Sequence, residues 1–230
     1  DAFWVGYEAV RIATKYMIPV VILSDGYIAN GAEPWLVPEM DELPEVNVTY
    51  HTDPENFKPY SRDAKTLARP WAIPGTPELE HRIGGIEKEN LTGDVSYDPE
   101  NHDKMCRTRA SKVLRIRNEF EPLEVNGADS ADLLLVSWGS TYGSVWEAVR
   151  RCQAKGQSVS HVHLRWLNPL PSDLGEILSR FKTVLVPEIN LGQLIKILRA
   201  EYLVDAVGFN LIRGLPFKAS EVEEEIQKYL

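Results

Sequence analysis

Charged side chains crowd the segment 69–93, which reads RPWAIPGTPELEHRIGGIEKENLTG. Its Pro-Gly and Gly-Gly pairs predict turns, and no apolar period predicts a buried helix or strand. Polar groups that converge on a loop of a rigid scaffold are typical of binding sites. A surface ionic cluster explains the same residues equally well, so both interpretations stay open. The five candidate residues are His81, Arg82, Glu87, Lys88 and Glu89.

A second candidate is the stretch VSWGSTYGSVWEAV (136–149), where an apolar run meets a Gly/Ser/Thr loop before a helical pattern. The free N–H groups at such a helix start can hold an anion. A P-loop needs a Lys before its Ser or Thr, and a dinucleotide loop needs G-x-G-x-x-G; neither is present. The favoured interpretation is a strand-to-helix turn with Ser140 or Thr141 starting the helix, and anion binding is the alternative.

Two pairs of metal-ligating residue types occur in the sequence. His161 and His163 lie on one side of a predicted strand, and His102 and Cys106 lie one helical turn apart. Neither pair has an evident third ligand, so we predict no metal site and favour a buried polar or interface role for the histidine pair. With Cys152 as the only other cysteine, a disulfide framework and a cluster held by this chain alone are excluded.

Asp25 follows the apolar run 18–23, at the kind of strand end where α/β sites form. A structural and a functional role for its carboxylate are equally consistent with this position. The helix predicted from Pro99 to about Glu119 carries several basic residues, for which a solvated face is favoured over a docking surface for an acidic partner. We expect Asp98 to cap this helix, with Pro99 at its first position.

Composition limits the possible partners. The 230 residues carry a net charge of −9, with a pI near 5.1, which disfavours nucleic acid and anionic membranes because both bind basic surfaces. No apolar run reaches the roughly 20 residues that span a bilayer. The scarcity of cysteine and the lack of a signal-peptide pattern predict a cytoplasmic protein.

Apolar periodicity divides the chain into three zones. Residues 1–40 predict a helix followed by a buried strand at 18–23, and this strand has no neighbour nearby, which suggests a C-terminal fragment of a longer protein. Residues 41–128 are proline-rich and irregular, with one strand at 46–51 before the long helix. Residues 129–230 alternate β-α-β-α-β-α-β-α, which predicts a doubly wound, mostly parallel sheet with helices on both faces.

Several stretches, taken in order, resemble the alpha subunit of 2-oxoacid:ferredoxin oxidoreductases, most closely the 2-oxoglutarate type. The resemblance covers nearly the whole chain. Its motifs are PVVILSDGYIAN, RPWAIPGTPELEHRIGGIEKEN, SYDPENHDKMCRTRASKV, VSWGSTYGSVWEAV, HLRWLNPLP, PEINLGQL and RGLPF. The resemblance implies that residues 1–40 end a pyrimidine-binding domain, which makes Asp25 a cofactor-domain candidate. It further implies that 41–128 form a linker with one long helix and 129–230 a transketolase C-terminal-like domain.

The resemblance implies an enzyme complex that decarboxylates a 2-oxoacid on thiamine diphosphate, releases an acyl-CoA and passes electrons to ferredoxin. Thiamine diphosphate with Mg²⁺ would be shared with a beta subunit that carries an iron–sulfur cluster, and CoA would be a co-substrate. The family's Tyr-Pro-Ile-Thr-Pro-type motif and its activating glutamate are absent from this sequence. We therefore expect no catalytic residue here, an inactive isolated chain and a hetero-oligomer. The expected interface residues are Glu188, Asn190, Gln193 and Arg213.

One departure from the family lies in the loop 69–93. The family often has Gly-Leu-Glu-His-Asp-Glu where this chain has Gly-Ile-Glu-Lys-Glu-Asn at 85–90. If the loop borders the substrate, Lys88 or Arg82 could pair with its distal carboxylate, for which a fixed cation is suited. Two other functions remain open: a stand-alone phosphate- or nucleotide-binding module that uses residues 139–144, and a pure subunit-interaction domain.

Overall fold

The computed structural model describes residues 1–230 and consists of two compact units. The first unit contains Asp1–Ile22 and Pro34–Glu119, and the second contains Leu23–Glu33 and Phe120–Leu230. The long helix predicted for the linker is therefore part of the first unit, whereas residues 23–33 are part of the second. None of the helices combines the length and apolar character that a membrane span requires.

The first unit is built around two helices, α1 (Ala2–Tyr16) and α3 (Pro99–Arg115). They meet at their C-terminal ends, where the Tyr16 hydroxyl donates a hydrogen bond to the carbonyl of Arg115 at 3.3 Å. Two short 3₁₀ turns, η1 (Met40–Glu42) and η2 (Ile116–Glu119), complete its regular structure. The predicted start of α3 is confirmed, because the Asp98 carboxylate accepts a hydrogen bond from the N–H of Glu100 at 3.1 Å and Pro99 occupies the first turn.

The strands predicted at 18–23 and 46–51 are wrong. Residues 19–25 are extended but pair with no strand, and the side chains of Val21 and Leu23 are 79% and 62% exposed. In the second segment only Tyr50 pairs, through an isolated bridge to Trp71. A β-branched run forms a strand only where a neighbour satisfies its backbone groups, and this chain places no such neighbour beside either segment.

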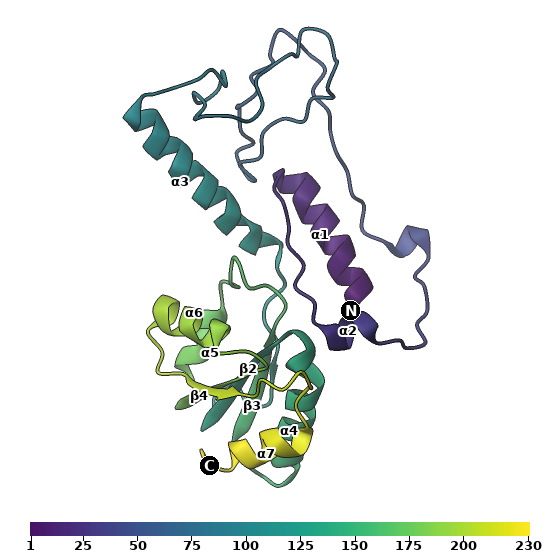
Figure 1. The fold of residues 1–230 in the computed structure, drawn as a ribbon, viewed down its shortest axis with the longest axis vertical. Helices are drawn as coiled ribbons and strands as arrows, with labels where there is room; N and C mark the ends of the chain where they lie inside the picture. Colours follow the sequence, from purple (N-terminus) through teal and green to yellow (C-terminus); the bar gives the residue numbers. More distant parts are fainter. The chain divides into compact units, whose positions relative to one another are not determined.

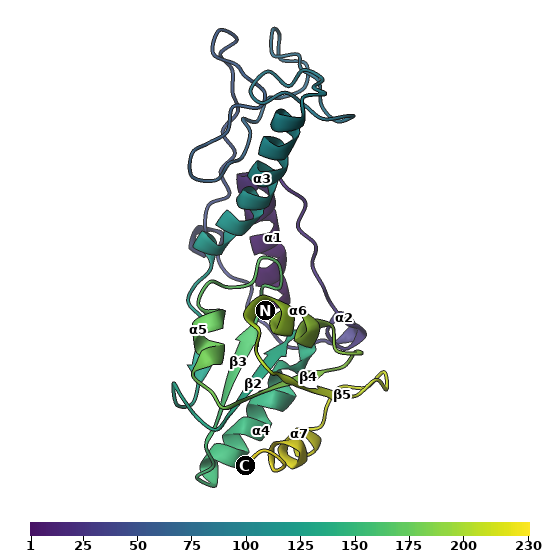
Figure 2. The same ribbon diagram turned by 90° about the vertical axis from the view of Figure 1, so that its left-hand side faces the viewer.

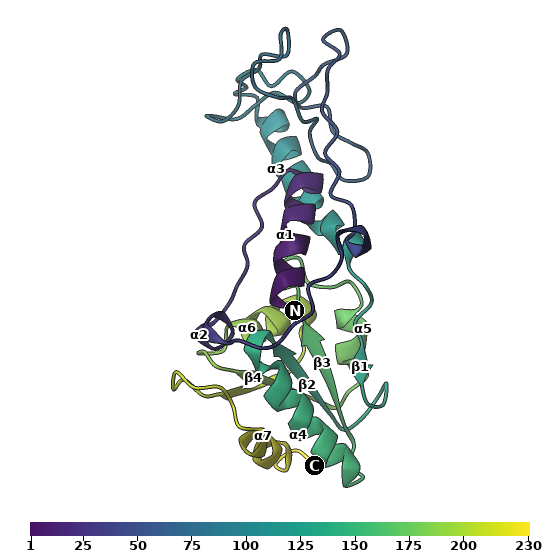
Figure 3. The same cartoon turned by 90° about the vertical axis from the view of Figure 1, so that its right-hand side faces the viewer.

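The second unit (lower part of Figure 1) is a five-stranded sheet in the order β1-β3-β2-β4-β5, with its strands labelled in Figures 2 and 3. Its strands are β1 (Val125–Asn126), β2 (Leu133–Trp138), β3 (Val159–Leu164), β4 (Thr183–Glu188) and β5 (Val207–Asn210). All neighbours run parallel except β1, which pairs antiparallel with β3. The predicted mostly parallel fold is confirmed, and the two-residue β1 is the only strand that the pattern did not predict.

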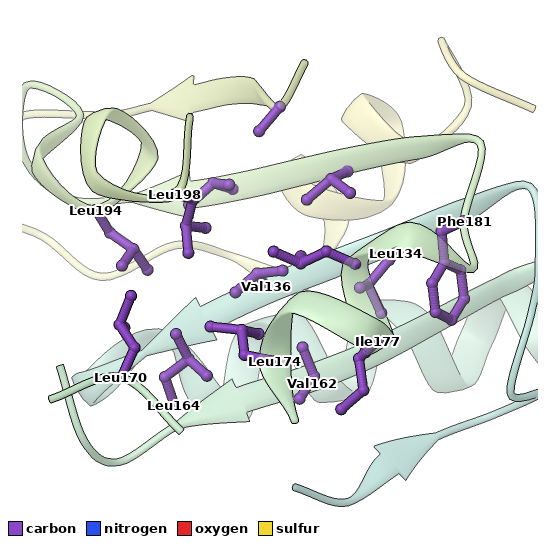
Figure 4. Packing of buried hydrophobic residues seen from close by; sticks show 14 residues of the cluster. Leu134, Val136, Val162, Leu164, Leu170, Leu174, Ile177, Phe181, Leu194 and Leu198 are labelled. Carbon is purple, nitrogen blue, oxygen red and sulfur yellow. The ribbon is translucent and has the colours of Figure 1, made fainter. Parts of the chain in front are cut away.

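Helices cover both faces of this sheet. Leucines of α5 (Leu174–Ser179) and α6 (Gln193–Tyr202) pack with Leu134 and Val136 on one face, as Figure 4 shows. On the other face, α4 (Tyr142–Ala154) and α7 (Ala219–Ile226) pack over Leu133 and Leu135. The central strand β2 is apolar on both sides because both sides are covered. The remaining helices of this unit are α2 (Gly26–Asn30) and the 3₁₀ turn η3 (Gly139–Thr141).

Candidate functional site

The loop 69–93 lies in the first unit, and the structure assigns its five candidate residues different roles. Lys88 is only 4% exposed, and its Nζ donates a hydrogen bond to the carbonyl of Ile86 at 2.5 Å. Its own carbonyl accepts a bond from the buried amide of Asn101 on α3, and its backbone forms a bridge with Val95. Lys88 thus joins the loop to α3 and does not present its charge to solvent.

Two further candidates serve the loop's own conformation. The Glu89 carboxylate closes a turn by accepting hydrogen bonds from the backbone N–H and the hydroxyl of Thr92, at 3.0 and 2.9 Å. His81 Nδ1 lies 2.7 Å from the carbonyl of Leu79, and its ring packs edge-on against Phe57. These contacts leave both side chains engaged within the loop.

The remaining two candidates, Glu87 and Arg82, differ from the three above in what their side chains contact. Glu87 reaches α3, where its carboxylate contacts His102 at 2.7 Å and Arg109 at 3.2 Å. The Arg109 hydrogen bond, with help from His102, holds the pKa of Glu87 below its usual value. Arg82 is exposed and forms no hydrogen bond or ion pair, so it is the candidate cation of this loop that is free to bind a ligand.

A further group of cations in the first unit was not predicted from the sequence. The guanidinium groups of Arg62 and Arg69 lie 5.9 and 4.7 Å from the centre of the Tyr60 ring, and both side chains line an open cavity of about 540 Å³. The Nε of Arg62 is buried without a partner. Burial, together with repulsion from Arg62 and Arg69, lowers the pKa of Lys112 to about 8.

Burial, and repulsion from neighbouring arginines, lower the pKa of both Lys112 and Arg62. The basic face of α3, predicted to be solvated, therefore includes a half-buried lysine beside two arginines from the loops. A surplus of partly buried positive charge favours an anionic ligand. The sequence offered no signal for this cluster, because its members come from three segments without a common spacing.

In the second unit, Asp25 and Ser140 contact each other. One oxygen of the Asp25 carboxylate caps α2 by accepting hydrogen bonds from the N–H groups of Tyr27 and Ile28, and the other accepts a bond from the Ser140 hydroxyl. Both oxygens are used structurally. Thr141 lies immediately before α4, as the predicted helix start requires, but its hydroxyl bonds the backbone of Trp138 and caps no N–H group of α4.

The histidine pair of β3 is joined by a serine of β2. The Ser137 hydroxyl lies 2.6 Å from His161 Nε2 and 2.7 Å from His163 Nδ1. His161 is fully buried, and burial lowers the pKa of His161 to about 3 and that of His163 to about 4. Both rings are therefore neutral at pH 7. This agrees with the buried polar role that the sequence favoured for the histidine pair.

Of the four expected interface residues, Glu188 requires a correction. It is fully buried, and its carboxylate accepts hydrogen bonds from the N–H groups of Leu194 and Ile195 at the start of α6. A side chain with no exposed surface cannot itself contact another subunit; its function in this chain is to organise the β4–α6 loop. Asn190 supports the same loop by accepting a bond from the N–H of Gly192, and Arg213 pairs with Glu221 at 2.8 Å. Interface roles for Asn190, Gln193 and Arg213 remain predictions.

Comparison with protein families gives two matches along this chain. Residues 1–97 match the thiamine-diphosphate-binding family of pyruvate flavodoxin/ferredoxin oxidoreductases, and residues 131–224 match core domain II of pyruvate:ferredoxin oxidoreductase. The first match includes part of the segment predicted as a linker. The three-zone division stays a prediction.

Individual proteins give closer matches. The chain is 50% identical over its full length to the 2-oxoglutarate oxidoreductase subunit KorA of Mycobacterium tuberculosis, of which it covers 35%. It is 32% identical to the 2-oxoglutarate synthase subunit KorA of Methanocaldococcus jannaschii, over 81% of this chain and 49% of that one. A solved structure of 2-oxoglutarate:ferredoxin oxidoreductase from Magnetococcus marinus, with 2-oxoglutarate, coenzyme A and succinyl-CoA bound, matches with a TM-score of 0.85. Its identity is 30%, over 95% of this chain and 38% of that one.

The chain therefore belongs to the 2-oxoacid:ferredoxin oxidoreductases, which confirms the resemblance found in the sequence. Within this family it groups with the alpha subunits of the 2-oxoglutarate type. It spans about a third of the length of the M. tuberculosis relative.

Proposed function

We propose that this chain is part of the alpha subunit of an enzyme that oxidatively decarboxylates 2-oxoglutarate. The products would be succinyl-CoA, CO₂ and two electrons that pass to ferredoxin. The observation that carries this proposal is the 50% identity to a 2-oxoglutarate oxidoreductase subunit over the full length of the chain. The fold adds support, because 95% of the chain matches a solved 2-oxoglutarate:ferredoxin oxidoreductase with a TM-score of 0.85.

The proposal includes the cofactors and partners of such a complex. Thiamine diphosphate with Mg²⁺ would be shared with a beta subunit, an iron–sulfur cluster would lie on that partner, and CoA would enter as co-substrate. The assembly would be a cytoplasmic hetero-oligomer. Large apolar side chains on the surface support burial against other parts of the complex. The most exposed before α3, all at least 74% exposed, are Val21, Leu36, Val37, Met40 and Tyr97.

In this proposal the cofactor is not held by this chain alone. Asp25 is the acidic candidate in the predicted cofactor domain, and both of its carboxylate oxygens already accept hydrogen bonds. The chain's proposed roles are therefore assembly and the formation of a border of the substrate site. For the second role, Arg82 is the best candidate, because it is the cation of the loop 69–93 that no internal contact occupies.

A substrate with two carboxylates requires a cation for the second one, and a guanidinium can bind it through two parallel hydrogen bonds. Substituting Arg82→Ala in the assembled enzyme tests this role. We expect kcat/KM for 2-oxoglutarate to fall about 10- to 100-fold, as for the loss of a hydrogen bond to a charged group, with a smaller effect on pyruvate. The control is Arg180→Ala, an exposed arginine of the second unit. Equal kcat/KM values for the wild-type enzyme and Arg82→Ala would remove Arg82 from the substrate site.

A further inference from the structure

Three potential metal ligands from two segments meet at one end of α3. His102 and Cys106 lie one turn apart on the helix, and Glu87 comes from the loop 69–93. The ligand atoms of the three residues all lie within 4.8 Å of one another. The sequence shows the helical pair but not the carboxylate that orients His102, and it therefore predicted no site. Glu87 becomes a neighbour because the Asn101 amide of α3 bonds the loop at the carbonyl of Lys88.

The orientation of His102 suits metal binding through Nε2. Its Nδ1 lies 2.7 Å from the Glu87 carboxylate, which accepts a hydrogen bond and so keeps the proton on Nδ1. The lone pair of Nε2 then points toward Cys106, whose Sγ is 3.6 Å away. A carboxylate that orients a histidine in this way is the usual partner of a metal-bound imidazole.

The distance between the two ligand atoms fits a tetrahedral metal. Zn–N and Zn–S bonds of about 2.0 and 2.3 Å, at a near-tetrahedral angle, place the two ligand atoms about 3.5 Å apart. The distance between His102 Nε2 and Cys106 Sγ is close to this, at 3.6 Å. No rearrangement of the helix is needed for both atoms to bind one ion.

The positive charge of Arg109 would repel a cation bound at this site, but the contacts of its guanidinium reduce this repulsion. Its Nη1 and Nη2 lie 3.2 and 3.5 Å from the two oxygens of Glu87, and Nη2 lies 3.1 Å from Cys106 Sγ. The Glu87 carboxylate balances the positive charge of Arg109. The Arg109 Nη2 group donates a hydrogen bond to the sulfur. His102 and Arg109 are partly exposed, so solvent screens the remaining repulsion.

We propose that His102 Nε2 and Cys106 Sγ bind a thiophilic divalent cation of the zinc class, held in position by Glu87 and Arg109. On binding, the metal replaces the thiol proton, which passes to solvent, and water completes the coordination. The ion would fasten the loop 69–93 to α3. This site is separate from the residues of the proposed function, and its test does not depend on enzyme turnover.

The test is the alkylation rate of Cys106 in the assembled enzyme, read by mass spectrometry of the peptide that contains it. A small molar excess of Zn²⁺ should slow the alkylation of Cys106 at least tenfold, whereas Mg²⁺, which prefers oxygen ligands, should have no effect. Cys152 is fully buried and reports any unfolding as an internal control.

Two variants identify the ligands. His102→Ala replaces an exposed side chain and should abolish the protection by Zn²⁺ while Cys106 remains reactive. Glu87→Gln should raise the Zn²⁺ concentration needed for half-protection about 10- to 100-fold, the usual cost of losing such an orienting carboxylate. Absence of protection by Zn²⁺, or equal protection in His102→Ala and wild type, would overturn the proposal.

Discussion

The Glu119 carboxylate joins η2 to α1, and its replacement tests how much this contact stabilises the first unit. The carboxylate lies at the end of η2 and contacts three side chains of α1: Arg11 at 2.8 Å, Lys15 at 2.7 Å and Tyr16 at 2.9 Å. Burial alone would raise its pKa. The hydrogen bonds from Lys15, Arg11 and Tyr16 outweigh burial and lower the pKa of Glu119 from 4.5 to about 2.

This pKa sets the expected energy. A lowering from 4.5 to about 2 corresponds to about 3 kcal/mol of stabilisation by the ionised group. The side chains of Glu119 and Arg11 are 15% and 19% exposed and that of Lys15 is 44% exposed, so screening reduces the expected value to about 2 kcal/mol. The stabilisation is complete above pH 4.5 and is lost as the pH falls toward about 2.

The substitution Glu119→Gln keeps the shape of the side chain and removes its charge. In the assembled enzyme we expect hydrogen exchange of the α1 amides to become about thirtyfold faster at pH 7, since 1.4 kcal/mol corresponds to a factor of ten. The difference should shrink below pH 4. Glu8→Gln is the matched control, because Glu8 lies on α1 and its carboxylate pairs only with Arg11 of the same helix. For this variant we expect hydrogen exchange of the α1 amides to become about twofold faster. Unchanged α1 exchange in Glu119→Gln, or equal effects of both variants, would refute the assignment.

Three further predictions concern the rest of the chain. Asp25→Ala removes the cap of α2 and should destabilise that helix by about 1 kcal/mol, which hydrogen exchange of residues 27–30 measures. Gly127→Ala would place a Cβ 2.6 Å from two side-chain atoms at a φ of 128°, whereas Gly156→Ala meets the φ penalty alone. The former should therefore lower the melting temperature more. Acetylation of Lys112 should rise with a midpoint near pH 8, and Arg62→Gln should move this midpoint upward, because it removes a repelling charge; an unchanged midpoint would contradict the described cluster.

The sequence predicted the second unit well because local pattern and tertiary environment agree there. Runs such as the LLLVSW of β2 are apolar on both faces, and each is followed by an amphipathic helix, so a covered parallel sheet is the arrangement that buries both. The start of α3 was predictable for a local reason, since Asp98 and Pro99 favour a helix start whatever surrounds them.

The first unit was predicted less well because its features depend on distant contacts. The apolar run 18–23 carries a strand pattern, but no strand pairs with it. Lys88 was expected to offer a charge to a ligand, yet the loop turns it inward to the carbonyl of Ile86. The convergence of Arg62, Arg69 and Lys112 likewise depends on how irregular segments meet, which residue spacing does not encode.

The central claim is the activity of the complex that contains this chain, and one measurement addresses it directly. The assembled enzyme is mixed with ferredoxin, and ferredoxin reduction is followed with 2-oxoglutarate and CoA present together or singly. We predict reduction that requires both compounds, with one succinyl-CoA formed for every two electrons transferred. No reduction of ferredoxin when 2-oxoglutarate and CoA are both present, or reduction without the formation of an acyl-CoA, would contradict the proposed function.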